Sequence, residues 1–122
     1  MLSSKFRIKK SLFQTLHVKG KSFHSPNLSL RFFKDVKNKE IDCHTPSRFA
    51  FIVSKKNLKL STKRNALRRR GYRAARSIFK KIKPCFVCAF YFKKGAEKLN
   101  YSEIENEVIA LLKKADAITN AS

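Results

Sequence analysis

The stretch KKNLKLSTKRNALRRRGYRAARSIFKKIK, residues 55–83, carries the strongest signal in this chain of 122 residues. Lys and Arg recur along it without an acid, and none of the chain's eight acidic residues lies between Asp42 and Glu97. Since no carboxylate within the stretch neutralises its positive charge, solvent counterions or a bound polyanion must do so. The stretch therefore predicts a negatively charged partner.

Residues 62–82 have the pattern of an amphipathic helix. The apolar members recur every three or four positions and predict one face turned towards a core: Leu67, Gly71, Ala74, Ala75, Ile78 and Ile82. The opposite side is basic and contains Arg69, Arg73, Arg76 and Lys80. Ser61 or Thr62 can cap the first turn, and Pro84 ends the run because it lacks an amide donor.

The charge of the whole chain agrees with a polyanionic partner. The formal net charge is +21, whereas 43% of the residues are hydrophobic and 11 are Phe, which favours a folded domain over a disordered tail. A solvated basic face is the simpler interpretation, but Arg side chains four residues apart oppose helix formation by roughly 0.2–0.5 kcal/mol per pair. By length we expect one domain over residues 1–122, and the charge favours RNA, DNA or an anionic membrane as its partner. The family resemblance described below makes it a single RNA-binding domain with its core over about 5–118.

The chain has no segment suited to crossing a membrane. Its longest apolar run, Cys85–Phe92, is far shorter than the roughly 20 residues that a spanning helix needs. Residues 1–19 are basic and free of acid, like a mitochondrial targeting peptide, but their apolar spacing assigns them to the fold, and they lack the apolar core of a secretory signal. The three cysteines form an odd set, so we expect reduced thiols and a cytoplasmic location.

Cys85 and Cys88 have the spacing of a zinc or redox pair. They lie in a run with the pattern of a strand, where an offset of three residues points two side chains to opposite faces. Cys43 and His44 would complete a metal site only if that strand prediction failed. No paired carboxylates, Ser-His-Asp set or phosphate loop is evident, so the sequence indicates a binding protein without catalytic residues of its own.

The remaining sequence predicts a mixture of helices and strands. In the first half we expect a helix over 5–19 ended by Gly20, then strands over 27–33 and 48–54 separated by a polar loop over 35–47. After the basic helix we expect a strand over 85–92 that is apolar on both faces, and a helix over 102–115. Ser102 and Glu105 can form the capping box of the last helix. A strand, a helix and a strand in succession imply a crossover that places the last two strands side by side, with the apolar one central.

Short motifs resemble a known family. The segment VSKK at 53–56, followed by a turn and by RN at 64–65 opening a basic helix, is similar to the protein subunit of bacterial ribonuclease P. The segments FQ at 13–14 and GKS at 20–22 resemble the first helix and turn of that family, and residues 101–115 resemble its closing helix. The family's Arg-Asn-Arg has Ala66 as its third residue here.

The resemblance implies a fold and an activity. The fold would be a single small α+β domain of order αβββαβα, with a left-handed crossover like that in the second domain of a small-subunit ribosomal protein. The chain would be the protein subunit of an endoribonuclease, a hydrolase whose catalytic RNA removes the 5′ leader of precursor tRNA with Mg²⁺ that the RNA mainly holds. The expected partners are that RNA and precursor tRNA, with no membrane and no DNA.

The resemblance also assigns residues to these partners. The turn and the basic helix would contact the catalytic RNA through Lys55, Lys56, Lys63, Arg64, Asn65, Arg68, Arg69 and Arg73. A cleft between the first helix and the sheet would hold the single-stranded leader through Phe13, His17, Arg31 and Phe33. No catalytic or metal-binding residue is expected in the protein.

Other functions remain open on the sequence. A structural ribosomal RNA-binding protein would have similar charge and could share the fold. A stand-alone nuclease would need a metal site built from Cys43, His44 or His17. A membrane-surface peptide is least favoured, because Gly71 and two Ala residues make the apolar stripe of the basic helix too small for strong insertion.

Overall fold

The computed structural model describes residues 8–34 and 47–118. Its helices and strands are α1 (Lys10–Lys19), β1 (Lys21–His24), β2 (Leu28–Lys34), β3 (Arg48–Ile52), α2 (Ser61–Ser77), β4 (Phe86–Phe92) and α3 (Tyr101–Lys114), with the 3₁₀ turns η2 (Phe79–Lys81) and η3 (Ala96–Lys98). This order confirms the expected α+β fold. No helix in these two ranges is long and apolar enough to span a bilayer.

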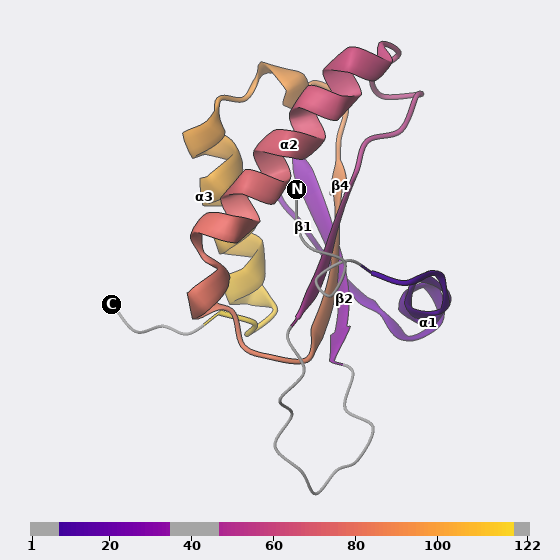
Figure 1. Cartoon of the computed structure of the whole chain (residues 1–122), viewed down its shortest axis with the longest axis vertical. Helices are drawn as coiled ribbons and strands as arrows, with labels where there is room; N and C mark the ends of the chain where they lie inside the picture. Colours follow the sequence, from indigo (N-terminus) through magenta and orange to yellow (C-terminus); the bar gives the residue numbers. More distant parts are fainter. Residues whose placement is uncertain (1–7, 35–46, 119–122) are drawn as a thin grey trace, which may run out of the picture.

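The four strands form one sheet in the order β1-β2-β4-β3. β2 pairs antiparallel with β1 and β4, whereas β3 lies parallel to β4, so α2 forms the crossover between two adjacent strands. The central position of β4 agrees with its apolar composition. Figure 1 shows α2 and α3 on one side of the sheet and α1 on the other.

β1 is the strand that the sequence pattern did not predict. Its four residues are mostly exposed, so they show no alternation of apolar and polar side chains. The strand forms because Ser25 and Leu28 close a tight turn, in which Ser25 N donates to Leu28 O at 2.8 Å. β1 is therefore a strand because it pairs with β2, and its own sequence carries no hydrophobic pattern that would predict it.

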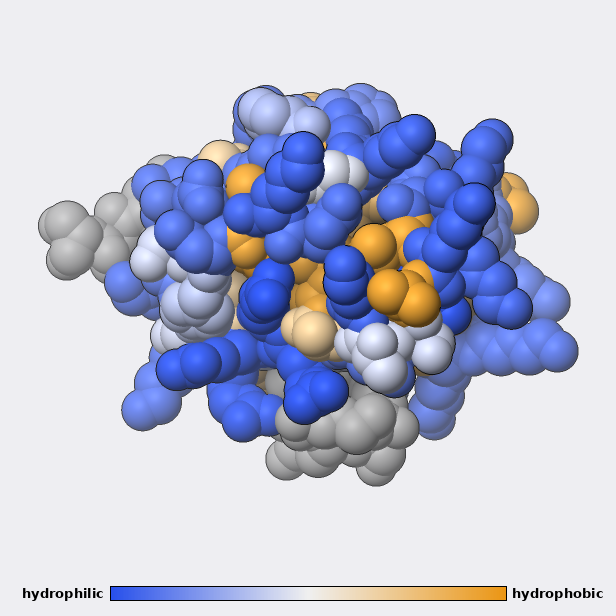
Figure 2. Space-filling model, turned by 90° about the horizontal axis from the view of Figure 1, so that it is seen from above, coloured by the Kyte–Doolittle hydropathy of each residue, from blue (hydrophilic) through white to orange (hydrophobic). Residues whose placement is uncertain are grey.

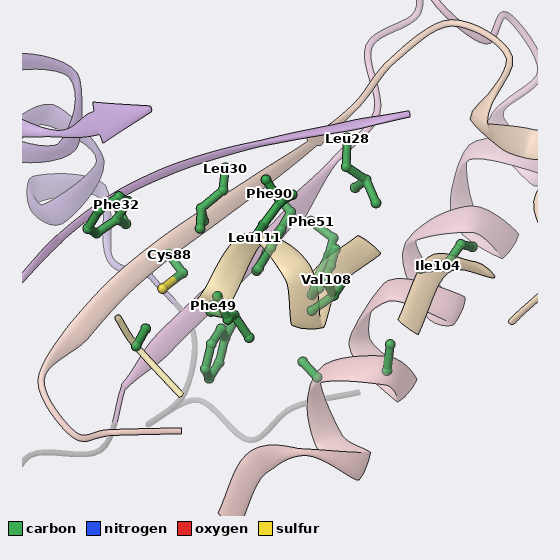
Figure 3. Close-up of a cluster of buried hydrophobic side chains, with 14 of the residues drawn as sticks. Leu28, Leu30, Phe32, Phe49, Phe51, Cys88, Phe90, Ile104, Val108 and Leu111 are labelled. Carbon is green, nitrogen blue, oxygen red and sulfur yellow. The ribbon is translucent and has the colours of Figure 1, made fainter. Parts of the chain in front are cut away.

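The core fills the space between the sheet and the two helices α2 and α3 (Figure 3). Alternate residues of β2 point into it, as the sequence predicts, and Phe90 and Phe92 of β4 join them. α3 contributes Ile104, Val108, Leu111 and Leu112, all fully buried. Since nonpolar side chains from the sheet, α2 and α3 meet here, burial of apolar surface holds α2 in place against the sheet.

α2 approaches β3 closely because position 71 has no side chain. A Cβ atom on Gly71 would lie 2.4 Å from Cδ1 of Phe51. The Phe51 ring stacks on Phe90 with a centroid distance of 4.9 Å, and the edge of Tyr72 packs on it at 5.0 Å. The predicted apolar stripe of α2 is therefore correct, and Gly71 sets its distance from the sheet.

The ends of α2 differ from the prediction. The helix ends at Ser77 rather than near residue 82, because Ile78 has φ −110° and ψ 8° and a 3₁₀ turn follows. No side chain caps its start, where Leu60 is the N-cap, so the prediction of a Ser61 or Thr62 cap was wrong.

The capping box of α3 was also predicted at the wrong residues. Asn100 is the N-cap: Glu103 N donates to Asn100 Oδ1 at 2.9 Å, and Asn100 N donates to Glu103 Oε1 at 3.0 Å. Ser102 and Glu105 have the same spacing, but the 3₁₀ turn η3 delivers the chain to the helix two residues earlier.

The cysteines differ partly from expectation. Cys88 is a free thiol in the core, and its burial raises its pKa, which makes it unreactive. Cys85 precedes β4 instead of lying in it and adopts a φ of 72°. It is disulfide-bonded, so the expectation of reduced thiols was wrong for this residue.

Candidate nucleic-acid interface

The exposed side of α2 forms a basic hollow with a volume of about 820 Å³. The lining residues are Asn65, Arg68, Arg69, Arg70, Tyr72, Arg73 and Arg76. Four of them are predicted RNA-binding residues, and they lie on one side because they recur every three or four positions of a regular helix. Figure 2 shows hydrophilic side chains around a small hydrophobic area at the end of the molecule where α2 begins.

Two Arg side chains of this hollow are held by the start of α3. Arg73 lies over the ring of Tyr101 with its guanidinium carbon 4.8 Å from the ring centroid, and Tyr101 Oη donates to Arg73 O at 3.4 Å. Arg70 Nη1 donates to Leu99 O at 3.4 Å. Stacking on an aromatic ring leaves the edge and the other face of a guanidinium open, so Arg73 is held in place for a phosphate or a base.

Arg64 has a structural role that its sequence position did not reveal. Its Nη1 donates to Leu58 O at 2.9 Å and to Lys59 O at 2.7 Å, and so it braces the chain just before α2. Arg68 Nη2 donates to Asn65 Oδ1, which links two predicted RNA-binding residues to each other. Lys63 lies exposed in the first turn.

The turn with Lys55 and Lys56 is tied to the end of β4. Asn57 N donates to Ser54 Oγ at 3.2 Å, which closes the turn, and Asn57 Nδ2 donates to Phe92 O at 3.1 Å. Both lysines are exposed. The structure therefore presents them beside the end of the sheet and next to the start of α2.

None of the described acidic residues lines the hollow, although Glu105 reaches the end of α2 and accepts a hydrogen bond from Ser77 Oγ at 2.8 Å. Glu97, Glu103, Glu105, Glu107 and Asp116 belong to η3, to α3 or to the turn after it. Glu107 receives hydrogen bonds from Ser25 and Asn27, and Asp116 pairs with Lys83 at 3.0 Å. The exposed side of α2 consequently keeps its positive potential.

Arg31 fastens α1 to the outer face of the sheet, the face opposite the core. Its Nε donates to Leu16 O at 2.8 Å, Nη2 to His17 O at 2.6 Å and Nη1 to Ser22 Oγ at 3.1 Å. Leu16 is the buried residue of α1, so one apolar side chain and one guanidinium hold this helix. Direct contact between Arg31 and a leader stays a prediction, since these bonds give the side chain a positioning role.

The other predicted leader-binding residues lie near this junction. Phe13 is half-buried and His17 exposed, both on α1, and Phe33 shares the outer face of β2 with Arg31. The structure thus brings the predicted residues of α1 and β2 to one side of the sheet.

Sequence reasoning missed Tyr91. This residue faces outward from the central strand β4, opposite Ser29 of β2 and Ile52 of β3. Burial raises the pKa of its phenol, and the positive charge of Arg31 partly offsets that rise. Alternation with the core residues Phe90 and Phe92 was the signal that could have identified it.

The described residues contain no group of three or more His, Cys, Asp or Glu side chains that could hold a metal ion. Cys43 and His44, which the nuclease alternative requires, lie outside those residues.

The mixed sheet and the Arg-lined hollow define a small α+β protein of the nucleic-acid-binding class. A sequence profile of the family described as Ribonuclease P matches residues 2–116. The ribonuclease P protein component of Microcystis aeruginosa is 31% identical over 106 residues, which are 87% of this chain and 86% of that protein. The chain belongs to the ribonuclease P protein family.

Solved structures agree with this assignment. The RNase P protein of Staphylococcus aureus is 27% identical, with a TM-score of 0.73 and coverage of 100% of this chain and 99% of that one. A mutant of it with defective mRNA degradation activity is 25% identical, with a TM-score of 0.76 over 93% and 90% of the two chains. The RNase P protein of Thermotoga maritima, at 21% identity, has the same fold, with a TM-score of 0.72 over 88% and 96%.

Family membership confirms the resemblance seen in the sequence and favours it over a structural ribosomal protein. The chain is a protein component of a ribonuclease, which acts in tRNA processing together with an RNA subunit.

Proposed function

We propose that this chain assists ribonuclease P RNA in the Mg²⁺-dependent removal of the 5′ leader from precursor tRNA, in the cytoplasm. α2 and the turn before it bind the catalytic RNA, and the outer face of the sheet beside α1 binds the single-stranded leader. The observation that carries the proposal is the hollow on α2, whose lining includes five Arg residues and no acid.

The side chains on α2 suit a phosphate backbone. Each guanidinium offers several donors in a plane and can bind phosphate through two of them at once. Arg68 and Arg69 lie in adjacent positions of the hollow, and Arg73 is supported from beneath by Tyr101. A surface of this kind recognises the course of an RNA backbone more than its base sequence.

The role of the protein in catalysis is electrostatic. Two RNAs repel each other, and cations on the protein that lie between them reduce this repulsion, so fewer metal ions are needed for substrate binding. The proposal assigns Mg²⁺ mainly to the RNA, as the resemblance to the family implies. The protein supplies binding and positioning.

The experiment is cleavage of a precursor tRNA by ribonuclease P RNA at low Mg²⁺, with and without the protein. The wild-type chain should stimulate cleavage at the correct 5′ end. Arg69→Ala should weaken binding to the RNA by about ten- to a hundredfold, because one charged hydrogen-bonding contact is worth roughly 1.5–3 kcal/mol. Lys113→Ala, which removes an equal charge from exposed α3, is the matched control and should behave like wild type. Equal stimulation by the two variants would contradict the assignment of α2.

A further inference from the structure

Tyr91 lies at the centre of the outer face of the sheet. Its strand neighbours Phe90 and Phe92 are 0% and 2% exposed in the core, whereas Tyr91 is only partly buried and lies on the opposite side. Its partners in the pairing register are Ser29, a small side chain, and Ile52, an apolar one. The phenol ring therefore lies between one small polar side chain and one apolar side chain.

The hydroxyl groups distinguish Tyr91 from the other tyrosines. Tyr72 Oη accepts a hydrogen bond from Phe51 N at 3.4 Å, and Tyr101 Oη donates to Arg73 O. Tyr91 makes no hydrogen bond with any residue in 8–34 or 47–118 through its side chain. Hydrogen bonds within the fold therefore use the hydroxyl groups of Tyr72 and Tyr101, whereas no described residue bonds to that of Tyr91.

Among the described residues, Arg31 is the charged group that acts on this ring. Arg31 lies two residues along β2 from Ser29, the partner of Tyr91, close enough for its charge to act on the phenol, and its guanidinium is bonded to the end of α1. The turn with Lys55 and Lys56 is bonded to Phe92 O, the carbonyl of the next residue along β4. α3, which has most of the described acids, packs on the other face of the sheet (Figure 1).

We propose that Tyr91 stacks on a base of the single-stranded leader, between α1 and the lysine turn, while Arg31 positions α1 and does not itself bind the leader. An aromatic ring on an open sheet face with cations along its border is a common arrangement for binding unpaired RNA, since the ring stacks on a base and the cations meet the phosphates. This inference rests on the proposed function, because it names the residue that binds the leader.

The first test compares two substrates with the assembled complex of protein and ribonuclease P RNA. Tyr91→Leu should weaken binding of a precursor tRNA by about tenfold, the size expected for one stacked base, and leave binding of mature tRNA unchanged. Tyr91→Phe keeps the ring and should bind both substrates like wild type. Unchanged affinity of the Leu variant for the precursor, or an equal loss for mature tRNA, would overturn the inference.

The second test uses the absence of Trp from this sequence. Tyr91→Trp introduces one indole, whose fluorescence reports on this site alone. Titration with precursor tRNA should quench the emission, and a precursor with abasic leader nucleotides should not. Emission that stays constant while the complex forms would refute stacking, and this result does not depend on the stability of the Leu variant.

The two proposals fail in different ways. If the wild-type complex bound precursor and mature tRNA equally, the leader-binding part of the proposed function would be wrong. If it preferred the precursor, and Tyr91→Leu kept that preference, only the role of Tyr91 would be wrong.

Discussion

Gly71→Ala tests whether the position of the basic helix depends on one close contact. The added Cβ would lie 2.4, 2.7 and 2.8 Å from three ring atoms of Phe51, much closer than atoms can approach. The ring cannot easily retreat, because it stacks on Phe90 at 4.9 Å and lies beside Phe92 at 6.0 Å. Either α2 moves outward or the core rearranges.

The magnitude follows from two opposing effects. Replacing Gly by Ala inside a helix favours folding by about 1 kcal/mol. Overpacking of a filled core opposes it by about 1–3 kcal/mol, and the stacked ring places this site near the upper end. We expect a net loss of about 1–2 kcal/mol in the free energy of unfolding, which corresponds to a fall in Tm of about 4–8 °C.

Denaturant unfolding of a double-mutant cycle measures this effect. In a Phe51→Leu background the smaller side chain leaves room, so Gly71→Ala should destabilise by at least about 1 kcal/mol less than in the wild-type background. A stabilising Gly71→Ala, or an equal cost in both backgrounds, would refute the close-contact argument. RNA binding measured on the same variants should weaken with the displacement of α2.

Three further predictions concern the attachment of α1, the acid stability of the fold and the RNA interface. Arg31→Lys keeps the charge but loses the three-way hydrogen bonding, so amide exchange should accelerate in α1 and stay unchanged in β4; equal rates in α1 would contradict the positioning role. Burial acts to raise the pKa of Glu107, but hydrogen bonds from Ser25 and Asn27 and the charge of Lys93 outweigh it and lower the pKa from 4.5. The ionised carboxylate therefore stabilises the fold above that pH, and this stability should be lost as the pH falls through the lowered pKa. The free energy of unfolding of Glu107→Gln should depend less on pH in that range. If the protein neutralises about six phosphates, its affinity for ribonuclease P RNA should fall by roughly three orders of magnitude between about 50 and 200 mM salt, and Arg68→Ala should reduce the slope by about 1 on a log–log plot; a flat salt dependence would exclude an electrostatic interface.

Local patterns in the sequence were sufficient for much of this protein. The apolar spacing of residues 62–82 predicted the buried side of α2, and the unbroken basic charge predicted the kind of partner. Alternation predicted the inward residues of β2, and the apolar run before Lys93 predicted a central strand. These features are readable because each depends on residues that are close together in the chain, where helical and strand periods act directly.

Only the tertiary structure decided the features that join distant residues. β1 exists because it pairs with β2, and α3 begins at Asn100 because a preceding turn delivers the chain there. The sequence position of Arg31 suggested a leader contact. In the structure its guanidinium holds α1 in place, because it donates to carbonyl groups at the end of that helix. Tyr91 was hidden within an apolar run until the sheet showed which face it occupies. Composition and period determine which side of an element is buried, whereas packing between elements determines which polar groups meet and which surface stays open.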